Sequence, residues 1–412
     1  MSCRGRIIKV VLRLITLLAL LPALWSQIPA SFDGSMVYDL SNGPILYNQL
    51  PNNEISQLST KLNFEPRHGY LLSVLKSLKI PISSQTLVFS KTSFQAPLIF
   101  PSAPRAIYFN DDTYIGWVKG ADYLEVSTAD PTLGAVFYVL EQEPKLKPRF
   151  QRHDDCLQCH HSARTAGVPG HIVRSVYTQP SGQIHTNTSN FITDHRSPME
   201  ERWGGWFVSG KSNFKHLGNQ LFPELDAASV IKTFDSPAWP TSTSDVVAHL
   251  VLAHQATGHN YIARLNYETR AALHLQHIMN EMDHKPDVVE GWSESTRRRI
   301  SSAIEATVRY LTFADEAPFP KPIVGDSTFT QDFSQQHPLK QFNLKTRLFE
   351  YPLSYLIDTK SMKALEPIIQ TKFEERLKQV LLNEAGRGEY SQLNAERARE
   401  AWRIHQNANS RN

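Results

Sequence analysis

Cysteine is scarce in this chain, since only Cys3, Cys156 and Cys159 occur in 412 residues. Three cysteines cannot build a disulfide-rich scaffold. Beyond the N-terminus no stretch approaches the ~18 apolar residues that cross a membrane as a helix. The formal net charge is only +3, without the basic patch that marks a nucleic-acid-binding protein. We therefore expect neither a membrane-embedded body nor a nucleic-acid partner.

The one apolar run lies at the N-terminus and has the layout of a secretory signal. The apolar stretch Leu14–Leu24 gives way to polar residues at Ser26, and four cations precede it, namely Arg4, Arg6, Lys9 and Arg13. This pattern predicts a signal peptide over residues 1–26 and a periplasmic or otherwise exported body. Neither small-residue pair near its end is a clean cleavage site. An uncleaved segment would act as an N-terminal membrane anchor, and this alternative stays open.

Removing the signal changes two properties of the chain. The four cations leave and no acidic residue precedes Asp33, so the charge of +3 falls to about −1. Cys3 leaves as well. Only Cys156 and Cys159 then remain, and no disulfide can form if both carry a cofactor.

These two cysteines belong to the motif Cys156-Leu157-Gln158-Cys159-His160, the CxxCH signature of c-type haem attachment. The two thiols bind the two vinyl groups on one porphyrin edge, and the following histidine is carried to the iron as its proximal ligand. The sequence therefore predicts one covalently attached haem c, bound by Cys156 and Cys159, with His160 on the iron.

Two other sites use a CxxC pair. A structural zinc site needs a second ligand pair on a separate knuckle or helix, and no second CxxC or HxxxH follows at the required distance. A thioredoxin-like redox site needs a helix directly after the motif. Here Gly167, Pro169 and Gly170 follow instead, so both alternatives are disfavoured.

The fold class we expect is α+β, with an N-terminal antiparallel β-rich region, a haem-attachment loop and a mainly helical C-terminal half. About 385 mature residues allow two or three subdomains. The expected divisions are the signal peptide, a linker with a short helix, the β-rich region, the c-type haem region and the helical region, over residues 1–26, 27–80, 81–145, 146–243 and 244–412.

Periodicity places the main elements. Short β-branched and aromatic runs predict strands over residues 86–90, 106–109, 114–118, 123–126 and 135–140. A hairpin turn is expected at residues 179–182. Helices are expected over residues 66–78, 244–282, 293–311, 371–383 and 391–406, the second of them capped by Ser244.

Several phrases of the chain resemble those of large exported bacterial proteins known as cytochrome c domain-containing proteins, which carry a single CxxCH. The resemblance covers about residues 86–365. It implies haem binding and electron transfer but no substrate, and only Cys156, Cys159 and His160 carry over. The phrases begin at Tyr108 (YFNDD), Asp155 (DCLQCH), Glu201 (ERWGGW), His254 (HQATGHN) and Thr346 (TRLFEYP).

Three hypotheses are open for the ligand in the sixth iron position. His254 lies on the apolar stripe of a predicted helix, with Gly258 one turn further on leaving room for a flat macrocycle. Met199, after a proline in a loop, could present its thioether. The third hypothesis is a sixth position that no side chain occupies. His161 is expected to face solvent or to support His160 and not to bind the iron. Five further histidines are weaker candidates for the sixth ligand: His171, His185, His195, His216 and His259.

The leading functional hypothesis is an exported mono-haem electron-transfer protein, which exchanges electrons with a redox partner protein or a small-molecule donor or acceptor. A peroxidase-type haem enzyme is the rival, with Arg164, His171 and Arg174 as a polar distal site. The two arginines also suit haem propionates. A haem-bearing sensor or interaction module is the third alternative.

Overall fold

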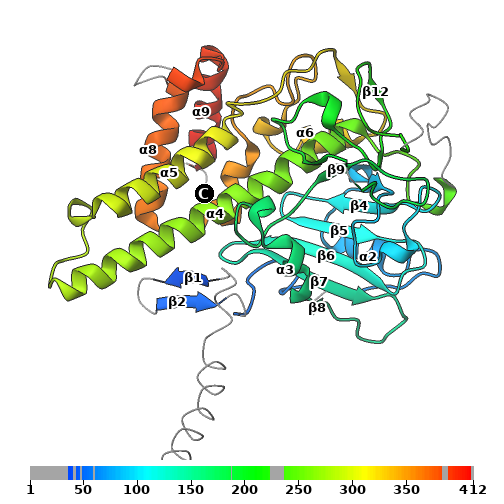
Figure 1. Ribbon diagram of the computed structural model, residues 1–412, viewed down its shortest axis with the longest axis horizontal. Helices are drawn as coiled ribbons and strands as arrows, with labels where there is room; N and C mark the ends of the chain where they lie inside the picture. The colour runs from blue at the N-terminus through cyan, green and yellow to red at the C-terminus, as the bar shows by residue number, and fades with distance from the viewer. Residues whose placement is uncertain are drawn as a thin grey trace, which may run out of the picture.

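The computed structural model describes residues 36–39, 43–46, 49–58, 61–186, 188–222, 236–382 and 388–409 (Figure 1). The predicted signal peptide and its cleavage site lie outside these residues. Within the described ranges, no helix combines the length and apolarity that a membrane span requires.

Seven strands of the described chain form one antiparallel sheet in the order β11-β3-β4-β5-β6-β7-β8 (Figure 1). All five predicted strands are present and lie side by side at its centre, whereas the two edge strands were not predicted because each is only two residues long. The strands are β3 (Thr86–Val88), β4 (Arg105–Phe109), β5 (Thr113–Trp117), β6 (Tyr123–Asp130), β7 (Gly134–Glu141), β8 (Gln151–Arg152) and β11 (Trp206–Phe207).

The alternation of side chains along β6 gives the sheet two different faces. Leu124 and Val126 share a buried core with helix α2 (Leu71–Ser77) on one face. The opposite face carries Ser127, which pairs directly with Tyr114 of β5 and Phe137 of β7. This second face holds the candidate site.

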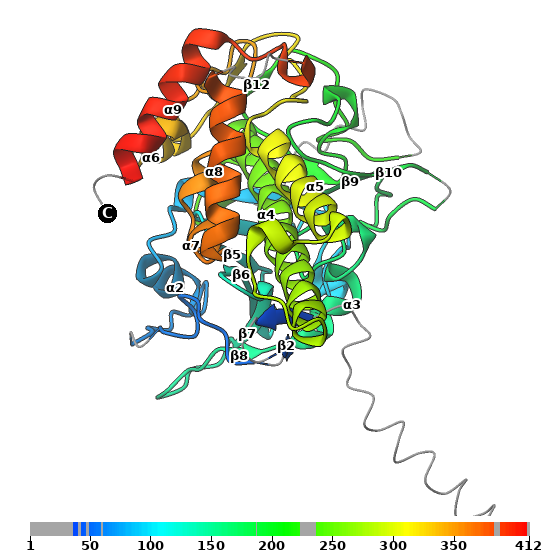
Figure 2. The same cartoon turned by 90° about the vertical axis from the view of Figure 1, so that its left-hand side faces the viewer.

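The C-terminal half is mainly helical, and the α+β fold class is confirmed. Helix α4 crosses the sheet and separates it from α5 and α8 (Figures 1 and 2). The predicted helices correspond to α2, α4, α5, α8 and α9. The helices of this half are α4 (Val246–Met282), α5 (Glu294–Leu311), α6 (Phe329–Ser334), α7 (Lys360–Lys363), α8 (Pro367–Leu382) and α9 (Ala395–Asn409).

The cap of α4 differs from the expectation. Asp245, not Ser244, accepts the backbone N–H of Val247 at 2.7 Å. The Ser244 hydroxyl instead accepts the Leu87 N–H at 2.9 Å and donates to the Phe207 carbonyl at 2.8 Å. Ser244 therefore ties the helix start to the sheet, a tertiary contact that helix-capping rules do not include.

Three short strand pairs complete the described topology. The predicted turn at residues 179–182 is present, closed by a hydrogen bond from Gln179 N–H to the Gln183 carbonyl at 2.8 Å. Gly182 has φ +85°, a backbone conformation that favours glycine. The pairs are β1 (Met36–Asp39) with β2 (Gly43–Leu46), β9 (Arg174–Val176) with β10 (Asn190–Ile192), and β12 (Lys211–Ser212) with β13 (Ile323–Val324).

Helix α4 is buried around its whole circumference over residues 246–260. The sheet covers one side, and other helices and connecting segments, including those with His195 and Ser354, cover the rest (Figure 2). Polar side chains on this stretch are therefore inside the protein and must find partners there. They include His254, Gln255, His259 and Asn260.

Candidate haem-attachment site

The CxxCH motif forms helical turns within the segment expected to be a loop. A 3₁₀ turn over Asp154–Cys156 runs into the single turn α3, Leu157–His160, beside β7 and β8 (Figure 1). Residues three and four apart share a helix face, so Cys159 and His160 project on the same side as Cys156. Both thiols are unbonded, with Cys156 half-buried and Cys159 exposed. The turn thus presents two thiols and one imidazole together.

Two hydrogen bonds join His160 to Gly170. The Gly170 N–H donates to the His160 carbonyl at 2.8 Å, and Nδ1 of His160 lies 2.9 Å from the Gly170 carbonyl oxygen. A carbonyl only accepts, so Nδ1 carries the hydrogen and Nε2 keeps its lone pair. Nε2 has no hydrogen-bond partner within the described chain, and burial lowers the pKa of His160. The ring is thus held neutral with one free nitrogen, as an iron ligand requires.

Gly170 is held in place by helix α4. A Cβ added to Gly170 would lie 2.3 Å from Oδ1 of Asn260, so only glycine fits here. The same Oδ1 accepts the His171 N–H at 2.7 Å, and the Asn260 amide donates to the His171 carbonyl at 2.7 Å. Asn260 therefore fixes the strand-like segment whose carbonyl orients His160.

His160 packs against the face of the sheet opposite α2. Its ring centroid lies 4.8 Å from that of Phe137, in the cross-strand row with Ser127 and Tyr114. The neighbouring row carries Glu125, which accepts from Gln95 at 2.8 Å and pairs with Arg105. This ion pair lies within electrostatic range of His160.

Charged groups surround both thiols. Burial, and then the nearby Glu125 carboxylate, raise the pKa of Cys156 to about 11. Near Cys159, burial and the cation of Arg164 lower the pKa of Arg174, while Cys159 raises the pKa of the same group. Two arginines therefore lie near the exposed thiol, where a guanidinium could pair with a propionate.

His254 is engaged elsewhere. Its Nδ1 lies 2.9 Å from Nδ1 of His195 and its Nε2 lies 2.8 Å from the Ser354 hydroxyl, in a fully buried position. The structure therefore matches a buried, hydrogen-bonded histidine and does not offer His254 as an iron ligand. The space predicted beside Gly258 is also filled, because a Cβ there would lie 2.3 Å from Cδ1 of Leu356.

Met199 is not presented by an open loop. It begins a 3₁₀ turn, is 3% exposed and belongs to the core cluster of the helical half. Among the weaker candidates, His216 contacts the Ser212 hydroxyl at 3.1 Å. His161, expected to support His160 or to face solvent, pairs through its backbone with Pro169. The structure does not bring Met199 or His254 together with the motif.

His171 lies behind His160. Nδ1 of His160 faces the Gly170 carbonyl, so Nε2, the nitrogen that would hold an iron, points away from Gly170. His171 follows Gly170 directly, and its ring packs on Phe137 and Tyr114 with centroids 6.2 and 4.5 Å apart. The structure places His171 inside the protein, against Phe137 and Tyr114, and its distal role stays a prediction.

The sequence interpretation missed the supporting residues Phe137, Gly170 and Asn260. Phe137 was assigned only to a strand, and Gly170 was used only as evidence against a helix. The phrase from His254 to Asn260 did contain a signal, since polar side chains recur there within an apolar helix.

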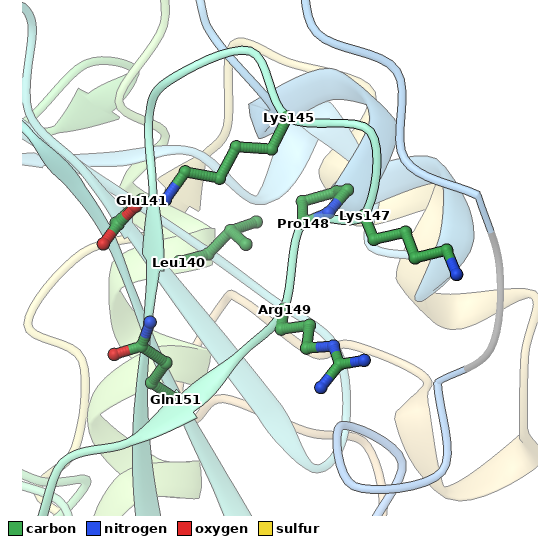
Figure 3. A pocket seen from close by; sticks show the side chains of 7 residues that line it. All are labelled: Leu140, Glu141, Lys145, Lys147, Pro148, Arg149 and Gln151. Carbon is green, nitrogen blue, oxygen red and sulfur yellow. Dashed lines mark hydrogen bonds and ion pairs between the residues drawn. The ribbon is translucent and has the colours of Figure 1, made fainter.

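One small pocket lies in the loop between β7 and β8 (Figure 3). Its volume is about 150 Å³, below the several hundred Å³ of ordinary cofactor sites. It is lined by Leu140, Glu141, Lys145, Lys147, Pro148, Arg149 and Gln151. A search of the described residues finds no group of three or more His, Cys, Asp or Glu that could hold a metal ion. A c-type haem does not need one, because the porphyrin supplies most iron ligands.

Comparison with known proteins gives no match to a protein-family model, a curated protein or a solved structure. The resemblance to cytochrome c domain-containing proteins therefore stays a prediction from sequence phrases.

Proposed function

We propose that this protein is an exported mono-haem c-type cytochrome-like protein that passes single electrons through a covalently bound haem. The observation that carries the proposal is the bond between His160 Nδ1 and the Gly170 carbonyl, at 2.9 Å. A ligand histidine is normally oriented by such a bond on its other nitrogen. The CxxCH spacing alone does not require this arrangement, so the bond is an independent feature that favours haem.

The residues of the chain have separate roles in this proposal. Cys156 and Cys159 provide the two thioether bonds, and His160 provides the proximal nitrogen. Gly170 orients that nitrogen, and Asn260 holds the Gly170 segment against α4. The haem, when bound, supplies the redox change of its iron.

Charge close to the site would tune that redox change. The Arg105 and Glu125 ion pair lies beside His160 and Cys156. Loss of the Glu125 carboxylate leaves a nearby cation uncompensated, which disfavours the ferric state, so Glu125→Gln should raise the reduction potential. The electron donor or acceptor is a redox partner protein or a small molecule that meets the haem edge outside the cytoplasm.

Mass and absorption measurements on protein exported from a host with c-type haem maturation test the proposal. We expect one haem per chain, bound through thioethers, and reversible one-electron reduction. Cys156→Ala with Cys159→Ala should give a folded, colourless protein. A wild-type chain that is exported and folded but carries no haem would contradict the proposal.

A further inference from the structure

A buried tyrosine and histidine form a hydrogen-bonded pair behind His160. Tyr114 of β5 and His259 of α4 are 7% and 4% exposed, and the phenol oxygen lies 3.0 Å from Nδ1 of His259. The proposed haem site does not use either side chain.

Gln255 fixes the direction of this hydrogen bond. Its amide NH₂ donates to the Asn110 carbonyl at 2.7 Å and to the Tyr114 oxygen at 3.0 Å, while its carbonyl oxygen accepts from Tyr355 at 2.6 Å. Since the Tyr114 oxygen already accepts from the amide, its own hydrogen points to His259. His259 Nδ1 is therefore the acceptor.

A chain of aromatic rings connects the pair to the motif. Ring centroids are 4.8 Å apart between His160 and Phe137, 6.2 Å between Phe137 and His171, and 4.5 Å between His171 and Tyr114. His171 also lies 5.8 Å from His259. Neither ring nitrogen of His171 has a hydrogen-bond partner within the described residues, although a buried imidazole usually has one.

We propose that Tyr114 is a redox-active tyrosine that donates one electron toward the haem and passes its proton to His259. This inference rests on the proposed function, because it needs a haem at His160. Phe137 and His171 lie between donor and acceptor as the electron path. The Tyr114–His259 pair would supply a second electron when an oxidant takes up more electrons than the iron alone provides.

The oxidant is a hydroperoxide. Cleavage of its O–O bond takes up two electrons and two solvent protons and gives water and an alcohol, or two waters from hydrogen peroxide. One electron comes from the ferrous haem group, which becomes ferric, and one from Tyr114. The Tyr114 O–H bond breaks, the proton moves to Nδ1 of His259, and the products are a neutral tyrosyl radical and an imidazolium.

Burial of Tyr114 and His259 favours movement of the electron and the proton in one coupled step. It raises the pKa of the Tyr114 phenol, so the phenol does not ionise by itself. Burial also lowers the pKa of His259 to about 4, so its Nδ1 is unprotonated and can accept. Transfer of the proton moves the positive charge from the oxidised phenol to the imidazole of His259, which is the more basic group.

Rapid-freeze electron paramagnetic resonance of the ferrous holoprotein mixed with one equivalent of hydrogen peroxide tests this inference. We expect an organic radical whose hyperfine pattern changes when ring-deuterated tyrosine is incorporated. The signal should be lost in Tyr114→Phe and weakened or shortened in His259→Gln. Tyr108→Phe is the matched control, because Tyr108 is also fully buried and donates to Gln85 at 2.6 Å, but faces the other side of the sheet.

Haem content measured on the same samples separates this inference from the proposed function. A haem-loaded wild type without a tyrosyl signal, or an unchanged signal in Tyr114→Phe, would overturn the role of Tyr114 and leave haem binding intact. If Tyr114→Phe does not fold, the wild-type spectrum in heavy water decides. A tyrosyl radical hydrogen-bonded to two exchangeable protons, one from the Gln255 amide and one from the protonated His259, supports the pair, and a radical with only one of them contradicts it.

Discussion

The Nδ1 atom of His160 lies 2.9 Å from the carbonyl oxygen of Gly170. This relationship selects the tautomer of the ring, because only a protonated Nδ1 can donate to the carbonyl. Nε2 is then the nitrogen with a lone pair. The bond also places Gly170 and the buried His171 on the Nδ1 side of the ring, so that Nε2 would be the nitrogen that holds an iron.

Replacing His160 by alanine should separate haem attachment from iron ligation. Both thioether bonds can still form, so the chain should keep one haem, but the iron should lose its proximal nitrogen and its absorption spectrum should change. Spectra of His160→Ala and of the control His161→Ala check this. An unchanged spectrum in His160→Ala would show that another residue is the proximal ligand.

Replacing Asn260 by alanine should lower the stability of the protein and also change the orientation of the His160 ring. The N–H and carbonyl of His171 both lose their partner inside the core, which costs about 1–3 kcal/mol for each group. Denaturant unfolding and the iron spectrum measure the two effects. Asn266→Ala, on the same helix and equally buried, should lower stability without changing the spectrum.

The sequence predicted the sheet centre, the main helices and the attachment motif because each depends on a local pattern. The five central strands have β-branched and aromatic runs, and α5 begins after Ser293, where the helix is predicted to start. The surroundings of the motif depend on tertiary contacts instead. The contacts from Asn260 to His171 and from Ser244 to Leu87 join residues far apart in the chain.

His254 illustrates why a helical stripe misleads in this fold. A stripe argument assumes that only one face of the helix is buried, but α4 is buried on all sides here. A histidine at any position on this stretch is therefore inside and has other partners. His254 uses both nitrogens for His195 and Ser354.

Gly258→Ala should lower the free energy of unfolding without changing the iron spectrum. The new methyl group would meet Leu356 in the core, and overpacking costs about 1–3 kcal/mol, against about 1 kcal/mol regained from helix propensity. Chemical denaturation measures the net loss. A change in the iron spectrum with stability intact would support the earlier expectation that a macrocycle lies beside Gly258.

Stability should fall between about pH 6.5 and about pH 9 through His405. Its Nε2 lies 2.8 Å from Glu374 and its Nδ1 lies 3.5 Å from Asp358, and these carboxylates raise the pKa of His405 to about 9 against the effect of burial. The folded state therefore holds the proton more tightly than the unfolded state, whose pKa is about 6.5. The stabilisation is complete below pH 6.5 and is lost as pH rises through 9.

We expect this effect to be about 1–3 kcal/mol, because the two carboxylates are partly exposed. Unfolding titrations at several pH values compare the wild type with His405→Gln. The variant should be less stable at pH 6 and should show a flatter pH profile. An equal slope in both proteins would assign the pH dependence to other groups.

The most direct test of the central claim is the pyridine haemochrome spectrum of the exported protein before and after acid-acetone extraction. Thioether bonds from Cys156 and Cys159 predict a c-type spectrum and colour that stays with the polypeptide. The same measurement on the Cys156→Ala and Cys159→Ala double variant should show no bound colour. Haem that is extracted from the wild type, or an exported folded wild type that never acquires haem, would contradict the account.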